Sequence, residues 1–218
     1  MSRLGVFGGT FDPPHYGHLA AAEEAGEVLG LERVLFLPTG EPPHKQGESI
    51  SSVAHRVRMV ELAIADNPRF ALSRVDVDRP GPSYTVDTLA LLQAAHGPTE
   101  LYFICGMDML ASFRAWHQPE RVLAECQLVA VTRPGYPDVD LAALERALPG
   151  ARARIHLLRA PGVDVSSTEL AERAAAGRSL RYLTPPAVIA YIHDHDLYRT
   201  EGRAVAPSPP GDLPARPD

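Results

Sequence analysis

The chain has 218 residues with 21 basic and 27 acidic side chains, which gives a formal net charge of −6. Hydrophobic residues make up 45% and charged residues 22%, as in globular domains, so collagen-like and disulfide-scaffold classes are excluded. The acidic balance argues against a broad nucleic-acid-binding surface. No apolar run approaches the roughly 18 residues of a membrane helix. We therefore expect a cytoplasmic protein with neither nucleic acid nor membrane as a partner.

Short runs rich in branched apolar residues recur along the chain and predict strands. Between them, apolar residues three or four positions apart predict helices, the first of which begins near Leu19. This alternation favours an α/β fold: a Rossmann-like, doubly wound parallel sheet in a single domain with a small C-terminal helical part. Ligands should bind beyond the carboxyl ends of the strands. The predicted strands are 4–7, 34–37, 70–77, 101–104, 128–131 and 155–158.

Two stretches depart from the alternation. Residues 38–54 form a long polar connection with Pro42, Pro43 and Gly47, and loops of this length are often functional. Residues 200–218 have five prolines in the last twelve positions and little to bury, which predicts a disordered tail after a domain of residues 1–199. Two cysteines, Cys105 and Cys126, form no CxxC pair, so we expect buried free thiols.

The most informative segment follows the first predicted strand and reads GGTFDPPHYGH at residues 8–18. Gly8 and Gly9 allow close approach of a ligand or a positive φ. The helix start offers unpaired N–H groups and a positive dipole end to an anion, and His15 and His18 can donate hydrogen bonds to phosphate there.

Other interpretations of this segment remain. A zinc pair would need a third ligand and the chain has no HExxH motif, whereas capping histidines on a Gly/Pro turn would need nothing more. The chain also lacks GxGxxG, GxxxxGK[ST] and GxSxG, which disfavours dehydrogenase-type, P-loop and α/β-hydrolase sites.

The segment resembles the HxGH signature of the nucleotidyltransferase superfamily, and its longer form GGTFDPPH resembles the bacterial nicotinate mononucleotide adenylyltransferases. Six further strings match that family in order and reach nearly to the tail. They are PPHK at 42–45, GPSYTVDT at 81–88, CGMD at 105–108, FRAWH at 113–117, RPGY at 133–136 and VSST at 165–168.

This resemblance implies an enzyme that transfers the adenylyl group of ATP to nicotinate mononucleotide, forming nicotinate adenine dinucleotide (deamido-NAD) and pyrophosphate in NAD biosynthesis. The attacking phosphate is largely ionised at neutral pH, so the reaction needs alignment and charge neutralisation more than a strong base. Mg²⁺, held mainly by the ATP phosphates and water, would supply further positive charge without a dedicated protein metal site. A homo-oligomer is possible in this family.

The resemblance also implies roles for individual residues. His15 and His18 would bind ATP phosphates and stabilise the transition state, Trp116 would stack on the pyridine ring, and the Thr85 N–H would meet the nicotinate carboxylate. The implied ATP-binding residues are Gly8, Gly9, Thr10, Phe11, Gly106, Asp108, Arg133, Ser166, Ser167 and Thr168. The implied mononucleotide-binding residues are Thr39, His44, Lys45, Thr85, Trp116 and His117.

Structural explanations stay open for several of these residues. Lys45, the only lysine, would otherwise be a solvated loop cation, Trp116 a core residue, Asp108 a helix cap, and Arg133 part of a surface ion pair.

The chain departs from the family pattern at two positions. The family reads [IV]SSTxxR, and its arginine helps to hold the ATP phosphates, but this chain has Ala171 at that place. Arg173 lies about 200° further around a helix and cannot simply replace it. His117 stands where the family often has tyrosine.

Within the transferase class, the acceptor could be the amidated mononucleotide or phosphopantetheine. Two other classes of function also compete with the transferase. A non-catalytic nucleotide-binding module would explain Ala171 but leaves His15 and His18 without a purpose. An oxidoreductase is disfavoured because its glycine fingerprint is missing.

Overall fold

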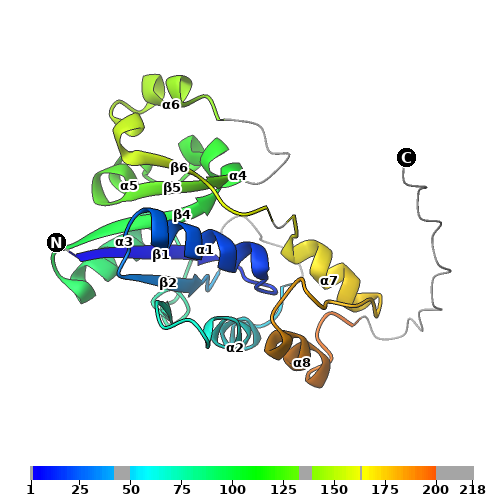
Figure 1. Ribbon diagram of the computed structural model, residues 1–218. Helices are drawn as coiled ribbons and strands as arrows, with labels where there is room; N and C mark the ends of the chain where they lie inside the picture. The colour runs from blue at the N-terminus through cyan, green and yellow to red at the C-terminus, as the bar shows by residue number, and fades with distance from the viewer. Residues whose placement is uncertain (1, 42–49, 133–138, 163, 200–218) are drawn as a thin grey trace, which may run out of the picture.

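The computed structural model describes residues 2–41, 50–132, 139–162 and 164–199. Six parallel strands form one sheet in the order β3-β2-β1-β4-β5-β6 (Figure 1). Because the chain winds outward in opposite directions from β1 and β4, the predicted doubly wound fold is confirmed. The strands are β1 (Ser2–Gly9), β2 (Arg33–Pro38), β3 (Phe70–Leu72), β4 (Thr99–Gly106), β5 (Gln127–Thr132) and β6 (Ile155–Arg159).

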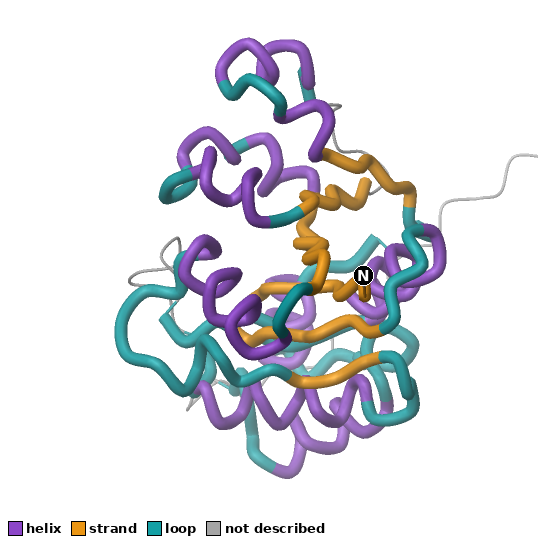
Figure 2. Tube along the Cα trace, turned by 90° about the vertical axis from the view of Figure 1, so that its left-hand side faces the viewer, coloured by secondary structure: helices purple, strands orange, loops and turns teal. Residues whose placement is uncertain are grey.

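Helices cover both faces of this sheet (Figure 2). One face packs against α1 (Tyr16–Val28), α2 (Val53–Ile64), α7 (Ser167–Ala175) and α8 (Pro186–Asp194). The other packs against α3 (Thr85–His96), α4 (Met107–Ala111), α5 (Pro119–Glu125) and α6 (Leu141–Ala147). Two short 3₁₀ turns, η1 (Phe113–Ala115) and η2 (Ala151–Arg154), complete the second layer.

The central strand β4 shows why the predicted strands read as nearly continuous apolar runs. Leu101, Phe103 and Cys105 are buried on one face of the sheet, and Tyr102 and Ile104 are buried on the other. Successive residues of a strand point to opposite faces, so a strand covered on both sides must be apolar at almost every position.

The third strand is shorter than the sequence predicted, because it ends at Leu72 and not at Val77. The Ser73 N–H still donates to the Phe36 carbonyl, but the N–H groups of Val77 and Asp78 donate back to the Arg74 carbonyl and close a turn. The apolar residues of this turn produce the sequence pattern of a strand, although only residues 70–72 pair with β2.

Both cysteines are buried and free, as expected. Burial raises the pKa of the Cys126 thiol to about 12 and raises that of Cys105 as well. No helix in the described ranges is long and apolar enough to cross a bilayer. The tail at 200–218 lies outside the described residues, so its disorder stays a prediction.

Candidate active site

A cavity of about 610 Å³ lies where the carboxyl ends of β1, β2, β4 and β5 meet the loops that follow them. This position is the one expected for a ligand site in an open parallel sheet, and the volume suits a small-molecule ligand. The residues of the predicted site that line it are Gly8, Gly9, Thr10, His18, Thr39, Thr85, Gly106, Asp108, Trp116 and His117.

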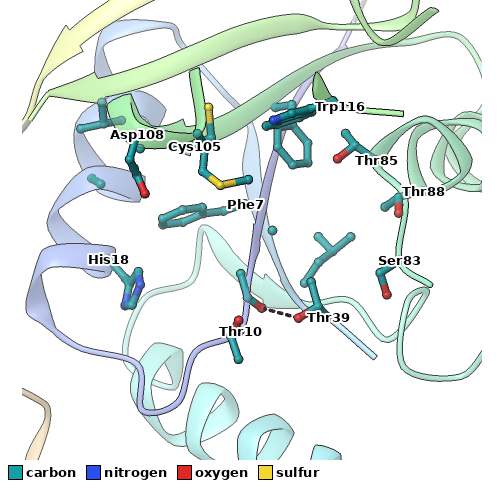
Figure 3. A pocket seen from close by; sticks show the side chains of 18 of the residues that line it. Phe7, Thr10, His18, Thr39, Ser83, Thr85, Thr88, Cys105, Asp108 and Trp116 are labelled. Carbon is teal, nitrogen blue, oxygen red and sulfur yellow. Dashed lines mark hydrogen bonds between the residues drawn. The ribbon is translucent and has the colours of Figure 1, made fainter. Parts of the chain in front are cut away.

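The pocket has two sides (Figure 3). His18 and Asp108 lie on one side, and Trp116 and Thr85 lie on the other, with Phe7 between them. Ten of the sequence-predicted residues therefore share one cavity although they come from positions 8 to 117 of the chain.

His15 and His18 stack at the start of α1, with ring centroids 3.6 Å apart and planes inclined by 24°. The helix begins at Tyr16, earlier than predicted, because His15 caps it. The His18 N–H donates to Nδ1 of His15 at 3.3 Å, and the His15 N–H donates to Nδ1 of His18 at 3.2 Å. Both Nδ1 atoms accept, so the proton of each neutral imidazole sits on Nε2.

Helix capping and phosphate binding therefore use different nitrogens of each imidazole ring. Capping occupies Nδ1, whereas Nε2–H remains the donor group of each ring. His18 lines the cavity, while His15 is only 1% exposed and does not line it.

The glycines that precede this turn do not adopt a positive φ; Phe11 does, at 52°. A Cβ on Gly8 would lie 3.2 Å from the Phe103 ring, and a Cβ on Gly9 would lie 3.0 Å from the Phe11 ring. Glycine therefore gives room for the aromatic rings and for a ligand in the cavity, and positive φ plays no part at these two positions. Phe11 itself is 1% exposed, packs in the core and does not line the cavity.

The opposite side of the cavity contains the start of α3. Its N-cap residue Tyr84 makes no side-chain capping bond, so the first turn presents backbone N–H groups at Thr85. The rings of Tyr84 and His117 lie beside it, tilted by 31° with centroids 4.4 Å apart. Trp116 is 8% exposed and meets Phe103 and Phe113 edge-on. Its buried Nε1–H has no hydrogen-bond partner among the described residues.

Sequence reasoning missed Asp76, which also lines the cavity. Its Oδ1 accepts from the Thr88 hydroxyl at 2.6 Å and from Nε of Arg79 at 3.2 Å. Burial raises the pKa of this carboxyl, and the bonds from Thr88 and Arg79 partly oppose that shift. The sequence pattern placed Asp76 in the predicted strand at 70–77. The only signal of its role was that an acidic residue lies shortly before GPSYT.

The serines expected to bind ATP do not line the cavity. Ser166 caps α7 by accepting from the Glu169 N–H, and the Ser167 hydroxyl donates to the Pro13 carbonyl at 2.9 Å. Thr168 likewise lies outside the lining. The Arg173 guanidinium donates to the Ser179 carbonyl, so whether it replaces the missing arginine stays a prediction. His44, Lys45 and Arg133 lie outside the described residues.

The fold and the site define a class, the cytidylyltransferase-like proteins, whose family model matches residues 6–173. The architecture agrees with a solved Plasmodium falciparum nicotinic acid mononucleotide adenylyltransferase complexed with NaAD. That chain superposes with a TM-score of 0.75 over 91% of this chain and 98% of its own length, at 18% identity.

Close sequence relatives narrow the class. A protein of Thermomicrobium roseum named "Probable nicotinate-nucleotide adenylyltransferase" is 48% identical over 92% of this chain and 93% of its own. A relative of the same name from Symbiobacterium thermophilum is 49% identical over 91% of this chain and 96% of its own. The chain belongs to the nicotinate-nucleotide adenylyltransferase family.

Proposed function

We propose that this protein transfers the adenylyl group of ATP to nicotinate mononucleotide and releases pyrophosphate. In this reaction an oxygen of the mononucleotide phosphate forms a bond to the α-phosphorus of ATP, and the bond from that phosphorus to the pyrophosphate oxygen breaks. The observation that carries the proposal is one cavity with His18 on one side and the uncapped start of α3 on the other. Two anionic substrates can thus be held in a single crevice.

ATP belongs on the side of His18. The Nε2–H of this histidine and the start of α1 are suited to the negative charge that gathers on the phosphates in the transition state. The reciprocal caps fix both imidazoles in the Nε2–H tautomer before substrate arrives. Asp108, on the same side, can accept hydrogen bonds from ribose hydroxyls.

Nicotinate mononucleotide belongs on the side of α3. The N–H groups at Thr85 suit the nicotinate carboxylate, because a helix start favours an anion. Trp116 and the neighbouring rings of Tyr84 and His117 offer aromatic surfaces for the pyridine ring. A carboxamide lacks the negative charge, so this end of the cavity favours the acid over the amide.

Magnesium enters this proposal as a companion of ATP, which supplies most of its ligands through phosphates and water. Within the described ranges, no three His, Cys, Asp or Glu residues are grouped so as to hold a metal; Asp108 has the right chemistry to accept from a metal-bound water. The metal would neutralise phosphate charge. A cytoplasmic location belongs to the same proposal, because the reaction consumes ATP.

The test is pyrophosphate release from ATP and Mg²⁺ with three acceptors at matched concentration: nicotinate mononucleotide, its amide and phosphopantetheine. We expect selective turnover of the acid. His18→Ala removes the Nε2–H donor and should lower kcat by about 100-fold or more. Preferred turnover of another acceptor would correct the substrate, and ATP binding without turnover of any acceptor would support the non-catalytic module.

A further inference from the structure

The turn that presents His15 cannot be held by its own backbone. Pro13 and Pro14 have no N–H group, so this part of the chain offers carbonyl acceptors without matching donors. Buried carbonyls need hydrogen-bond donors from elsewhere in the molecule. Arg56, 1% exposed on α2, supplies one by donating Nη1 to the Thr10 carbonyl at 3.0 Å.

The C-terminal helical part, residues 164–199, supplies the donors for the two prolines. The Ser167 hydroxyl donates to the Pro13 carbonyl at 2.9 Å, and the Thr184 hydroxyl donates to the Pro14 carbonyl at 2.7 Å. Thr184 is 1% exposed, so no water competes for this bond. Residues more than 150 positions away in the sequence therefore hold the residues that lead into His15.

A third contact comes from Tyr198, close to the end of the described chain. Its hydroxyl donates to Oδ1 of Asp12 at 2.5 Å, while the Ser51 N–H donates to Oδ2 of Asp12 at 2.8 Å. Burial and the neighbouring Asp12 carboxylate raise the pKa of the Tyr198 phenol, so it stays a neutral donor. Tyr198 has a φ of 68°, which a non-glycine residue keeps only where surrounding contacts hold it.

We propose that Tyr198 and Thr184 are positioning residues for the adenylyl transfer, acting through Asp12 and Pro14 on the turn that fixes His15 and His18. Tyr198 and Thr184 touch the turn and do not line the cavity. Their hydrogen bonds set where the His15 backbone begins α1, and the His15 backbone in turn holds the His18 ring. Because a misplacement of about 1 Å can cost about 100-fold in rate, such distant support reaches the chemistry.

The kinetic test, which rests on the proposed function, compares two half-buried tyrosines whose hydroxyls have different partners. Tyr198→Phe removes the bond to Asp12. Tyr191→Phe is the matched control, because Tyr191 is also half-buried in the C-terminal part but its hydroxyl bonds His55 at 3.0 Å. We expect Tyr198→Phe to lower kcat about 10-fold with KM for ATP within about twofold of wild type. Thr184→Val should act in the same direction, and Tyr191→Phe should behave as wild type.

A second readout needs no turnover. Nitrogen-15 NMR of the histidine rings reports tautomer and hydrogen bonding, so Tyr198→Phe should shift the ring signals of His15 and His18 while Tyr191→Phe shifts that of His55. A kcat for Tyr198→Phe within about twofold of wild type, or an equal loss in both tyrosine variants, overturns the proposal. If wild type turns over no acceptor, the proposed function fails by itself, and unchanged His15 and His18 signals in Tyr198→Phe would overturn the positioning role separately.

Discussion

His18 uses its two ring nitrogens for different purposes, and the two can be separated by substitution. Asparagine places an oxygen close to the position of Nδ1, whereas alanine keeps neither an acceptor nor a donor. His18→Asn should keep the bond from the His15 N–H and hence the melting temperature, but lose about 100-fold in kcat because the transition-state donor is gone. His18→Ala loses both groups, so its kcat should fall as far and its stability should also fall, by about 1 kcal/mol.

Kinetics and thermal melting of the two variants check this division. If His18→Asn melted as low as His18→Ala, the assignment of Nδ1 to capping would be wrong. A high kcat in His18→Asn would exclude Nε2–H as a donor to the phosphates.

Ala171 is the position where this chain lacks the arginine of its family pattern. It lies in α7, whose neighbouring Arg173 is already bonded to the Ser179 carbonyl. Ala171→Arg would offer a charge-assisted, bidentate donor to phosphate, worth about 1.5–3 kcal/mol. We expect KM for ATP to fall about 10-fold with little change in kcat.

The control for that prediction is Glu172→Arg, which adds positive charge at an exposed neighbouring position of the same helix. Steady-state kinetics at varied ATP distinguish the two variants. Equal effects of both would point to general electrostatic attraction, and no effect of Ala171→Arg would mean that the phosphates do not approach this position.

Among the secondary-structure elements, the start of α3 is oriented by a hydrogen-bond network around Asp76. Asp76 accepts from Thr88 in the first turns of α3 and from Arg79, and the Arg79 Nη1 donates to the Pro82 carbonyl just before the helix. The backbone of Asp76 also packs against the loop after β2, since a Cβ on Gly40 would lie 2.5 Å from the Asp76 carbonyl oxygen. Asp76 therefore connects α3, through its carboxylate, with the loop after β2, through its backbone.

The raised pKa of Asp76 predicts a pH dependence of stability. Its folded pKa lies above the unfolded value, so the native state holds this proton more tightly. Stability therefore falls as pH rises from the unfolded pKa through the folded one. Asp76→Asn cannot ionise and escapes this loss, so its free energy of unfolding should rise relative to wild type over that window. Urea unfolding at a series of acidic pH values checks it, and parallel profiles would contradict the assigned direction.

The elements were predictable where a local pattern determined them. All six strands were found from their apolar runs, because a sheet covered on both faces leaves almost no polar positions. The end of β3 was missed because Val75 packs against the core from a turn, which a run of letters cannot distinguish from a strand. The start of α1 was placed too late because histidine is not a usual N-cap residue.

Residue chemistry located an anion site at the start of the first helix, and the resemblance supplied the rest of the predicted site. Residues of the matching strings gather in one cavity. The contacts of Asp76 left no signal in the sequence, and neither did those that Thr184 and Tyr198 make with the turn before His15. These contacts depend on how separate segments of the chain meet in the fold. A single sequence carries local periodicity but not such tertiary pairings.

In the whole molecule, the sheet and the C-terminal part share the task of building the site. The strands bring loops from many parts of the chain to one edge, and α7 and α8 pack against the same sheet face as α1 and α2 (Figure 1). The chain must therefore extend to residue 198 before the turn that leads into His15 can form its hydrogen bond to Tyr198.

Two truncations that differ by two residues test where the functional chain ends. Ending the chain after Arg199 removes only residues 200–218, whose composition predicts no packed structure, so kcat and melting temperature should match those of the full chain. Ending it after Leu197 also removes Tyr198 and Arg199. The ion pair between Arg199 and Asp196 is exposed and contributes little, so the loss of the Tyr198 contact dominates and kcat should fall about 10-fold. Equal activity of the two truncations would show that the turn holds its geometry without Tyr198, whereas a loss already present in the longer one would assign a role to the tail.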